Sequence, residues 1–314
     1  MKRALGVLVF LVAVLVGLLV YSFTPKTLDV EAYKSGASFV PGIKPSAEVS
    51  LTLLNTGMMI SKELFTYRGG SPGKTYESGM AAALVRHPKG DLLIDAGFGR
   101  NVDLHVDRMP ALMQWLASYV KEVPAADQMQ RAGIDPRSIK QVILTHSHWD
   151  HISGLEDFPG VEVLMPPAEL EFIRLRRMPG LIDEMIDKLN VRTFNFTEKP
   201  YENFSSSYDL FGDGTVVAVP LPGHTDGSLG VFVNLPSGKR FFFTGDLTWS
   251  EEGLTLPAER PWLARRLVDY GEEDVRRSIV RVHELLKKYP EMIVVPAHDR
   301  RIHESIASLP KYEQ

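Results

Sequence analysis

The stretch of sequence that decides the fold lies at residues 145–151 and reads Thr145-His146-Ser147-His148-Trp149-Asp150-His151. It follows directly on the apolar run 141–144, which has the composition of a short buried strand. In an extended backbone His146 and His148 point to the same side, because side chains alternate along a strand. Zinc and similar metals favour imidazole and carboxylate ligands, and four such side chains stand within six residues. This spacing indicates a metal site at the end of a strand.

Four further strand-like runs end in the same way, each at a residue that can bind a metal or orient a ligand. The runs 216–219, 241–244, 293–296 and 92–94 lead to His224, Asp246, His298 and Asp95, in that order. Taken singly, each residue has a simpler explanation as a turn aspartate or a hydrogen-bonded loop histidine. Because a rigid metal site draws its ligands from several elements, the five strand ends together predict one shared site.

The order of these residues, with H-x-H-x-D-H as its centre, resembles the metallo-β-lactamase superfamily of metal-dependent hydrolases over roughly residues 45–305. The resemblance implies an α/β fold, the αββα four-layer sandwich, with two divalent metal ions in a groove at one edge of its two sheets. The implied roles are one metal at His146, His148 and His224, the other at Asp150, His151 and His298, Asp246 as the bridge, and Asp95 as a carboxylate that orients the ligands. Zinc is the expected metal, and iron, manganese and cobalt remain alternatives because they accept the same ligands.

The aspartate at position 246 narrows this resemblance. True β-lactamases of the superfamily carry cysteine or serine there, whereas an aspartate is similar to the lactonase, glyoxalase II and phosphodiesterase branches. The helix predicted over residues 272–289, followed by the run into His298, most resembles N-acyl homoserine lactonases. Those enzymes carry a tyrosine three residues after the bridging aspartate, and this chain has Trp249. An indole N–H can donate to a substrate carbonyl but cannot act as an acid or base, and simple packing is the other role open to Trp249.

The expected reaction is hydrolysis of an ester-like bond, with a lactone of the N-acyl homoserine type as the first choice. Two metals lower the pKa of a shared water from 15.7 to about 7, so that a metal-bridging hydroxide is the expected nucleophile. Asp150 is expected to carry a proton to the leaving group, which makes Asp150, Asp246 and Trp249 the predicted catalytic residues. A thioester hydrolase similar to glyoxalase II, a phosphoester hydrolase and a non-hydrolytic iron enzyme remain alternatives. The complete ligand set argues against a degenerate binding module.

Composition agrees with one large catalytic domain and a small-molecule substrate. The chain has 314 residues, a net charge of −4 and no cysteine. A chain of this length can form a large core without dividing into two domains. Lysine and arginine are spread along the chain, so the basic surface that a nuclease needs for phosphate backbones is absent, and nucleic acid is not an expected partner. The oligomeric state is not indicated.

The first residues form a second strong signal. Lys2 and Arg3 precede residues 4–20, which are entirely apolar or glycine. With its apolar extension this run reaches the roughly 20 residues that span a bilayer, and the basic flank places the start in the cytoplasm. The alternative is a cleaved signal peptide, whose apolar part is usually about 7–15 residues long.

The predicted organisation follows from this signal. It comprises a membrane anchor or signal peptide at 1–23, a tether rich in proline, glycine and serine at 24–46, and the catalytic domain at 47–314. The catalytic domain is expected in the periplasm or outside the cell, attached to the membrane through the N-terminal helix. A secreted soluble form is the alternative.

Two stretches are additional to the minimal sandwich. An apolar stripe within residues 109–120 is typical of a helix that packs on the body, and a lid, a dimer face or a membrane-facing surface are the alternatives. Residues 178–211 contain a predicted short helix at 181–189 and several aromatic residues, which would form a substrate wall or cover the core. Further candidates for an acyl-chain pocket stand in an early loop, namely Met58, Met59, Phe65 and Tyr67.

Overall fold

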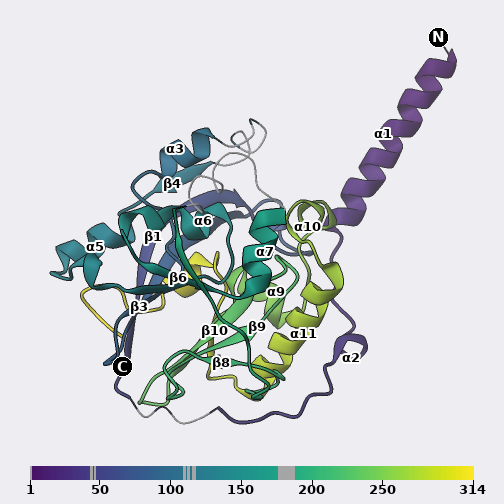
Figure 1. The fold of residues 1–314 in the computed structure, drawn as a ribbon. Coiled ribbons are helices and arrows are strands. Elements are labelled where there is room, and N and C mark those ends of the chain that lie inside the picture. The colour runs from purple at the N-terminus through teal and green to yellow at the C-terminus, as the bar shows by residue number, and fades with distance from the viewer. Residues whose placement is uncertain are drawn as a thin grey trace.

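Two sheets packed face to face between helices form the centre of the molecule (Figure 1). The computed structural model describes residues 2–42, 45, 47–108, 111, 114, 118–175 and 188–314. Within this part of the chain, one sheet has seven strands in the order β4-β1-β2-β3-β5-β6-β7, and the other has five in the order β12-β11-β10-β9-β8. The predicted αββα sandwich is confirmed.

The strands differ in length and direction. The first sheet contains β1 (Ser50–Lys62), β2 (Thr75–Arg86), β3 (Leu92–Ile94), β4 (Tyr119–Lys121), β5 (Gln141–Ile143), β6 (Glu162–Met165) and β7 (Asn190–Thr193). The second sheet contains β8 (Tyr208–Asp209), β9 (Val216–Pro220), β10 (Leu229–Asn234), β11 (Arg240–Phe243) and β12 (Ile293–Val295). β3 pairs with β5 in parallel, and β11 pairs with β12 in parallel. Each parallel pair therefore brings two strand ends to one edge of its sheet, which is where the predicted site residues follow.

Helices α3, α5 and α6 cover the outer face of the first sheet, and α11 covers that of the second. The helices of the described residues are α1 (Lys2–Phe23), α2 (Val30–Tyr33), α3 (Val102–Asp107), α5 (Ala125–Arg131), α6 (Trp149–Ile152), α7 (Pro167–Leu175), α9 (Glu251–Thr255), α10 (Trp262–Val268), α11 (Glu272–Lys288) and α12 (Arg300–His303). Short 3₁₀ turns complete the elements at η1 (Glu63–Phe65), η2 (Pro136–Ser138), η3 (Ser153–Asp157) and η4 (Gly245–Leu247).

Three apolar layers hold the sandwich together. Between the sheets, Leu51 and Ile143 of the first sheet belong to one buried cluster with Val231 of the second. A second cluster joins the outer face of the first sheet to α3, α5 and α6. A third joins the outer face of the second sheet to α11, whose Val275 and Ile279 are fully buried. Burial of apolar surface on both faces of each sheet supplies the main driving force for this arrangement.

Two of the aromatic residues after residue 190 belong to the apolar core, and the predicted substrate wall stays a prediction. Phe194 is buried between the sheets, and Phe204 packs on the outer face of the second sheet, 6.0 Å from the ring of Phe242. Residues 181–187 of the predicted insertion helix lie outside the described residues. Most of the stripe predicted as a helix within 109–120 also lies outside them, and its end is not helical, because Tyr119 and Val120 belong to strand β4, which pairs with β1. Among the early pocket candidates, Phe65 contacts Phe23 edge to face at 5.6 Å between ring centroids.

Helix α1 projects away from the body of the molecule (Figure 1). It is long and apolar enough to cross a membrane, and its most apolar window has no buried residue. Only its last turn is attached. Ser22 is 1% exposed and its Oγ accepts a hydrogen bond from the Leu263 N–H at 3.0 Å. The Arg68 guanidinium donates to the backbone oxygens of Tyr21 at 2.7 Å and Thr24 at 3.1 Å.

The segment after α1 lies along the catalytic body. The Leu28 N–H donates to the Pro257 oxygen at 2.8 Å, and Val40 pairs with Glu202 in an antiparallel bridge. α2 contacts α11 in the same segment. The division at residues 23 and 46 stays a prediction, and the described part of residues 24–46 runs along the surface in contact with the domain.

Candidate metal centre

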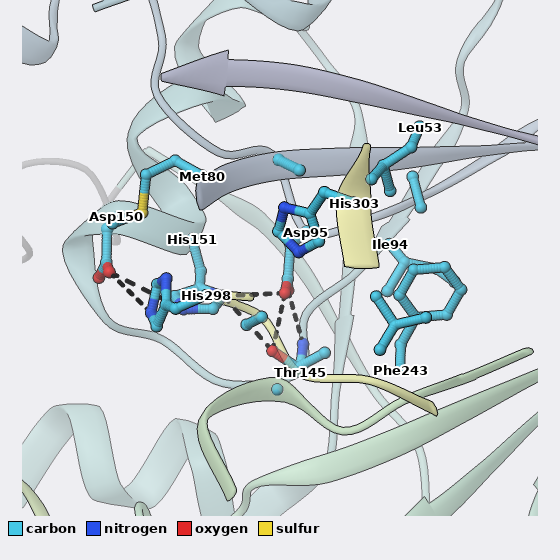
Figure 2. Close-up of a pocket in the computed structure, with 15 residues that line it drawn as sticks. Leu53, Met80, Ile94, Asp95, Thr145, Asp150, His151, Phe243, His298 and His303 are labelled. Atoms are coloured by element: carbon cyan, nitrogen blue, oxygen red, sulfur yellow. Dashed lines mark hydrogen bonds and ion pairs between the residues drawn. The ribbon is translucent and has the colours of Figure 1, made fainter. Parts of the chain in front are cut away.

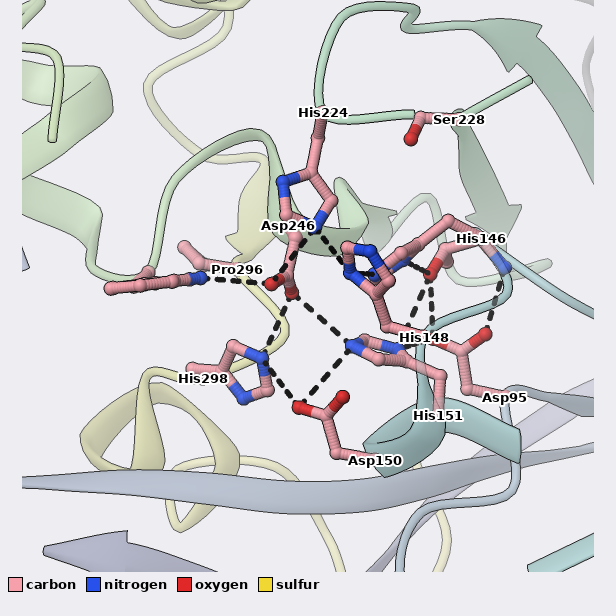
Figure 3. A network of polar contacts seen from close by, with 12 residues as sticks. Asp95, His146, His148, Asp150, His151, His224, Ser228, Asp246, Pro296 and His298 are labelled. Atoms are coloured by element: carbon pink, nitrogen blue, oxygen red, sulfur yellow. Dashed lines mark hydrogen bonds and ion pairs between the residues drawn. The ribbon is translucent and has the colours of Figure 1, made fainter. Parts of the chain in front are cut away.

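All seven predicted metal ligands meet at the edge where strand ends of both sheets converge (Figure 3). His146 and His148 follow β5, Asp150 and His151 lie in α6, His224 lies in the turn between β9 and β10, Asp246 lies in η4 after β11, and His298 follows β12. Two of the seven ligands are carboxylates, and Asp150 is the more exposed of them. Its side chain is 12% accessible, whereas that of Asp246 is 5% accessible. The ligand atoms therefore lie in a mostly dry site that opens near Asp150.

The seven side chains divide into two groups. The first ligand group consists of His146, His148 and His224. The Nδ1 atom of His148 lies 3.0 Å from Nε2 of His146 and 2.8 Å from Nε2 of His224. Three ring nitrogens that converge in this way offer lone pairs to one cation.

The second ligand group consists of Asp150, His151 and His298. Oδ2 of Asp150 lies 3.3 Å from Nε2 of His298 and 4.0 Å from Nε2 of His151. This group therefore adds a negative charge that the first ligand group lacks.

The carboxylate of Asp246 stands between the two groups. Its Oδ1 lies 2.9 Å from Nε2 of His298 and 3.2 Å from Nε2 of His151, whereas its Oδ2 lies 3.4 Å from Nε2 of His224. Oδ1 of Asp246 and Nε2 of His151 are buried without a hydrogen-bond partner among the described residues. Buried polar atoms without partners are costly, and a divalent cation coordinated here would satisfy both. The residues present thus fit metal ions.

The pKa of His146 and His148 is shifted in the opposite direction from that of His298. Burial, reinforced by the neighbouring histidines, holds the pKa of His146 and His148 well below the usual value, so both rings are neutral. Burial also disfavours charge on His298, but the carboxylates of Asp246 and Asp150 outweigh it and raise the pKa of this ring. Burial raises the pKa of Asp246 as well, but the facing histidines reverse that effect and hold it well below the usual value. Asp246 is therefore an anion, the form in which a carboxylate binds metal.

Asp95 lies behind the second ligand group (Figure 2). Its Oδ2 accepts a hydrogen bond from Nδ1 of His151 at 2.8 Å, and its Oδ1 accepts one from the Thr145 N–H at 2.7 Å. Because Nδ1 of His151 is engaged by the carboxylate, Nε2 is the nitrogen that faces Asp150 and Asp246. Outer partners of this kind set the tautomer and the orientation of a ligand ring. A cavity of about 30 Å³ lies beside these residues.

Glu169 holds the first ligand group, and the sequence pattern did not reveal it. This side chain in α7 is fully buried. Its carboxylate accepts hydrogen bonds from the Ser147 N–H at 2.7 Å, from the Thr225 hydroxyl at 2.6 Å and from the Gly227 N–H at 3.2 Å. Ser147 stands between His146 and His148, and Thr225 follows His224. Glu169 thereby ties a loop of the first sheet to a loop of the second.

Asp269, itself paired with Arg260, also holds a histidine of the first ligand group. Oδ1 of Asp269 accepts from Nδ1 of His224 at 3.0 Å and from Nη1 of Arg260 at 2.8 Å. The same guanidinium donates to the backbone oxygen of Asp246. His298 is held differently, since its Nδ1 donates to the Gly79 oxygen at 3.0 Å. No spacing in the sequence pointed to Arg260, which lies between α9 and α10, or to Asp269, which directly follows α10.

Trp249 lies beside the shared carboxylate. Its indole Nε1–H donates to Oδ2 of Asp246 at 2.8 Å, and the guanidinium of Arg260 lies over its ring at 4.7 Å from the centroid. The Trp249 backbone oxygen accepts from the Tyr76 hydroxyl at 2.9 Å. The single donor of the indole is therefore engaged with Asp246 in this structure.

Comparisons with known proteins agree with this site. The model of the metallo-beta-lactamase superfamily matches residues 80–298. A probable metallo-hydrolase of Mycobacterium tuberculosis is 28% identical over 243 residues, covering 70% of this chain and 74% of the relative. The N-acyl homoserine lactonase AttM of Rhizobium radiobacter is 26% identical over 269 residues, covering 80% and 94%.

Solved structures show the same fold. An N-acyl homoserine lactone hydrolase with N-hexanoyl-L-homoserine at its catalytic metal centre superposes with a TM-score of 0.67 at 18% identity, covering 85% of this chain and 99% of that one. The dizinc quorum-quenching lactonase AidC gives a TM-score of 0.53 at 15% identity, covering 88% and 92%. The family match and the converging His and Asp side chains together identify a metallo-hydrolase: the chain belongs to the metallo-beta-lactamase superfamily.

Proposed function

We propose that the protein is a dinuclear metallo-hydrolase that opens lactones of the N-acyl homoserine type. The observation that carries this proposal is the position of the Asp246 carboxylate, with one oxygen toward each ligand group. A carboxylate with this placement suits a pair of divalent ions. Zinc is our first choice because one of the similar structures is a dizinc lactonase.

The chemistry divides between the metals and the chain. Divalent ions, when bound, supply Lewis-acid polarisation of a carbonyl and activation of water at neutral pH. The chain contributes a fixed, dry frame in which the seven side chains are held before substrate arrives. Asp150 has the accessible carboxylate, and we assign to it transfer of a proton to the alkoxide that leaves as the lactone ring opens.

Trp249 is assigned a positioning role in this proposal. Its indole N–H donates to Asp246, so it orients the shared carboxylate and is not available to a substrate carbonyl at the same time. The substrate carbonyl then depends on the metals alone for polarisation.

The lactone is favoured by the similar proteins. Among the similar proteins, several are named N-acyl homoserine lactonases. Two buried apolar side chains lie next to the ligands, with the ring of Phe172 at 6.5 Å from the ring of His148 and Met80 beside Asp150. We further propose that α1 anchors the enzyme in a membrane with its catalytic domain on the outer side, as the basic residues before the apolar run favour.

The deciding experiment pairs elemental analysis with a substrate panel. The full chain, purified in detergent, is assayed for metal content and for hydrolysis of acyl homoserine lactones, a glutathione thioester, a phosphotriester and a β-lactam. Two metal equivalents and preferred turnover of the lactones are expected. Preferred turnover of the thioester or phosphotriester would contradict the lactone assignment, and a single metal equivalent in a fully active enzyme would contradict the dinuclear centre.

A further inference from the structure

Helix α10 carries apolar side chains that no described part of the protein covers. Leu263 is 44% exposed and Leu267 is 71% exposed. They are four residues apart and therefore lie on one face of the helix. The opposite side is fixed to the body through Arg265, whose buried side chain pairs with Glu259 and lies 3.7 Å from Glu272. α10 thus presents an apolar face outward while it is held rigidly from within.

This face lies beside the point where α1 leaves the body (Figure 1). The Leu263 N–H donates to Oγ of Ser22, and the next residue of α1, Phe23, packs against Phe65, which is itself 42% exposed. Because the end of a membrane-spanning helix marks the boundary of the hydrocarbon, the membrane surface passes close to Leu263. We name Phe65, Leu263 and Leu267 the membrane-proximal patch.

The polar groups around the patch are those that lipid headgroups favour. Tyr21 in the last turn of α1 is 51% exposed, with the Arg68 guanidinium 5.0 Å from its ring centroid. Trp262 begins α10, and Arg266, whose side chain is 59% exposed, lies 5.9 Å from its ring centroid. Tyrosine and tryptophan are enriched at membrane–water interfaces, and arginine is attracted to anionic headgroups.

We infer that the membrane-proximal patch rests in the interface of the lipid bilayer and gives the enzyme a second membrane contact beside α1. This inference rests on the proposed role of α1 as an anchor. Lipid is the occupant that the structure favours, because the patch continues the fully exposed apolar surface of α1 at its end. A short amphipathic helix with apolar and basic side chains is suited to this location.

The contact has a consequence for substrate access, because α10 connects the patch to the metal centre. Asp269 directly follows α10 and accepts a hydrogen bond from His224. The ring of Tyr270 lies 4.8 Å from that of Phe172, and Phe172 lies beside His148. The centre is therefore held close to the bilayer surface, where amphiphiles with an acyl chain concentrate.

The absence of cysteine from the chain makes a clean labelling test possible. Leu267→Cys and the control Glu291→Cys, both at exposed positions, each receive one nitroxide label in the otherwise native full chain. Glu272 lies 3.0 Å from Arg266, and the 17 residues of α11 then lead away toward Glu291. The control label is therefore about 25 Å from α10. The chains are reconstituted into vesicles of phosphatidylcholine and phosphatidylglycerol.

Electron paramagnetic resonance then compares collisions of each label with oxygen, which enters lipid, and with a nickel chelate, which stays in water. We expect a severalfold higher oxygen-to-nickel ratio at position 267 than at position 291. Equal ratios would overturn the membrane contact. Spin–spin broadening at position 267 that disappears when unlabelled chain is added would also overturn it, in favour of an interface between two copies.

Flotation of the same vesicles separates this inference from the proposals on which it rests. A chain that hydrolyses lactones but does not float with vesicles would overturn the anchor and the patch together and leave the hydrolase proposal intact. A chain that floats while its label at position 267 is as exposed to nickel as the control would overturn the patch alone.

Discussion

The two ligand groups share Asp246 but differ in charge and in how they are held. The first ligand group offers only imidazoles, and burial keeps two of them neutral. The second adds the carboxylate of Asp150, and its histidines face carboxylates that raise the pKa of the rings. A cation in the second position is therefore neutralised more completely. The first position depends more on rigid placement of its rings, which Glu169 and Asp269 provide.

The strongest test of this comparison removes the group that both positions share. Asp246→Ala should reduce hydrolysis by well over 100-fold and lower the metal content by at least one equivalent, because outer partners alone typically contribute 10- to 100-fold. Elemental analysis and initial rates measure both effects. The control Asp135→Ala, at an exposed turn, should change neither. A variant that keeps two equivalents would show that Asp246 does not bridge.

Glu169→Gln should affect the first position more than the second. In the wild type, both carboxylate oxygens of Glu169 accept from N–H or O–H donors. In the variant, the amide nitrogen of glutamine replaces one of these acceptors and cannot accept a hydrogen bond. The loops that carry His146, His148 and His224 therefore lose their common support. The metal in the first position is expected to be the more weakly bound of the two. We expect its dissociation constant to rise by about 10- to 100-fold in titrations against a chromophoric chelator. Glu171→Gln, at an exposed position of the same helix, is the matched control. An equal loss of metal affinity at both positions would contradict the assignment of Glu169 to the first position.

Asp95→Asn tests the second position in the way that Glu169→Gln tests the first. We expect metal affinity to fall by about tenfold, which is less than for Glu169→Gln, because Asp95 orients one ligand ring only. The backbone of Asp95 has a positive φ of 55°, which asparagine tolerates nearly as well as aspartate. The substitution therefore changes the hydrogen bonds to His151 and Thr145 and leaves the backbone unstrained. An unchanged chelator titration would mean that His151 keeps its orientation without Asp95.

Trp249→Phe should have the smallest effect, about tenfold or less on the rate, since the lost hydrogen bond supports Asp246. Trp249→Tyr should fall between this variant and the wild type. A loss of about 100- to 1,000-fold in kcat with unchanged metal content would instead identify the indole as a donor to the substrate oxyanion. Steady-state rates on one lactone, together with metal analysis, distinguish these results.

The converging side chains could be predicted from the sequence because each group follows the end of a strand. His146 and Asp95 follow neighbouring parallel strands, and Asp246 and His298 follow another parallel pair, so backbone topology alone brings them to one edge. The spacing within H-x-H-x-D-H placed His151 on the same turn of chain as Asp150. The apolar stripe of α11 likewise predicted its buried face, because apolar residues at the helical period all lie on one side of the helix.

The outer partners could not be predicted in this way. Glu169 is one acidic residue in a short helix, and its burial follows from the packing of α7 beneath two loops that are distant in sequence. Arg260 and Asp269 lie in the connections before and after α10, which have no periodicity. The aromatic residues Phe194 and Phe204 had two readings because composition does not tell a core from a pocket wall. Only the tertiary structure distinguishes such cases.

The attachment of Ser22 to α10 bears on processing of the N-terminus. A peptidase has to bind the chain in an extended form, and segments that are exposed and weakly bonded are cut most readily. Residues 21–23 are instead helical, with Ser22 1% exposed and held by Leu263. Cleavage here is therefore in competition with folding of the catalytic domain. A chain that folds first keeps its anchor, and a chain that is cut first loses the residues that α10 and Arg68 bind.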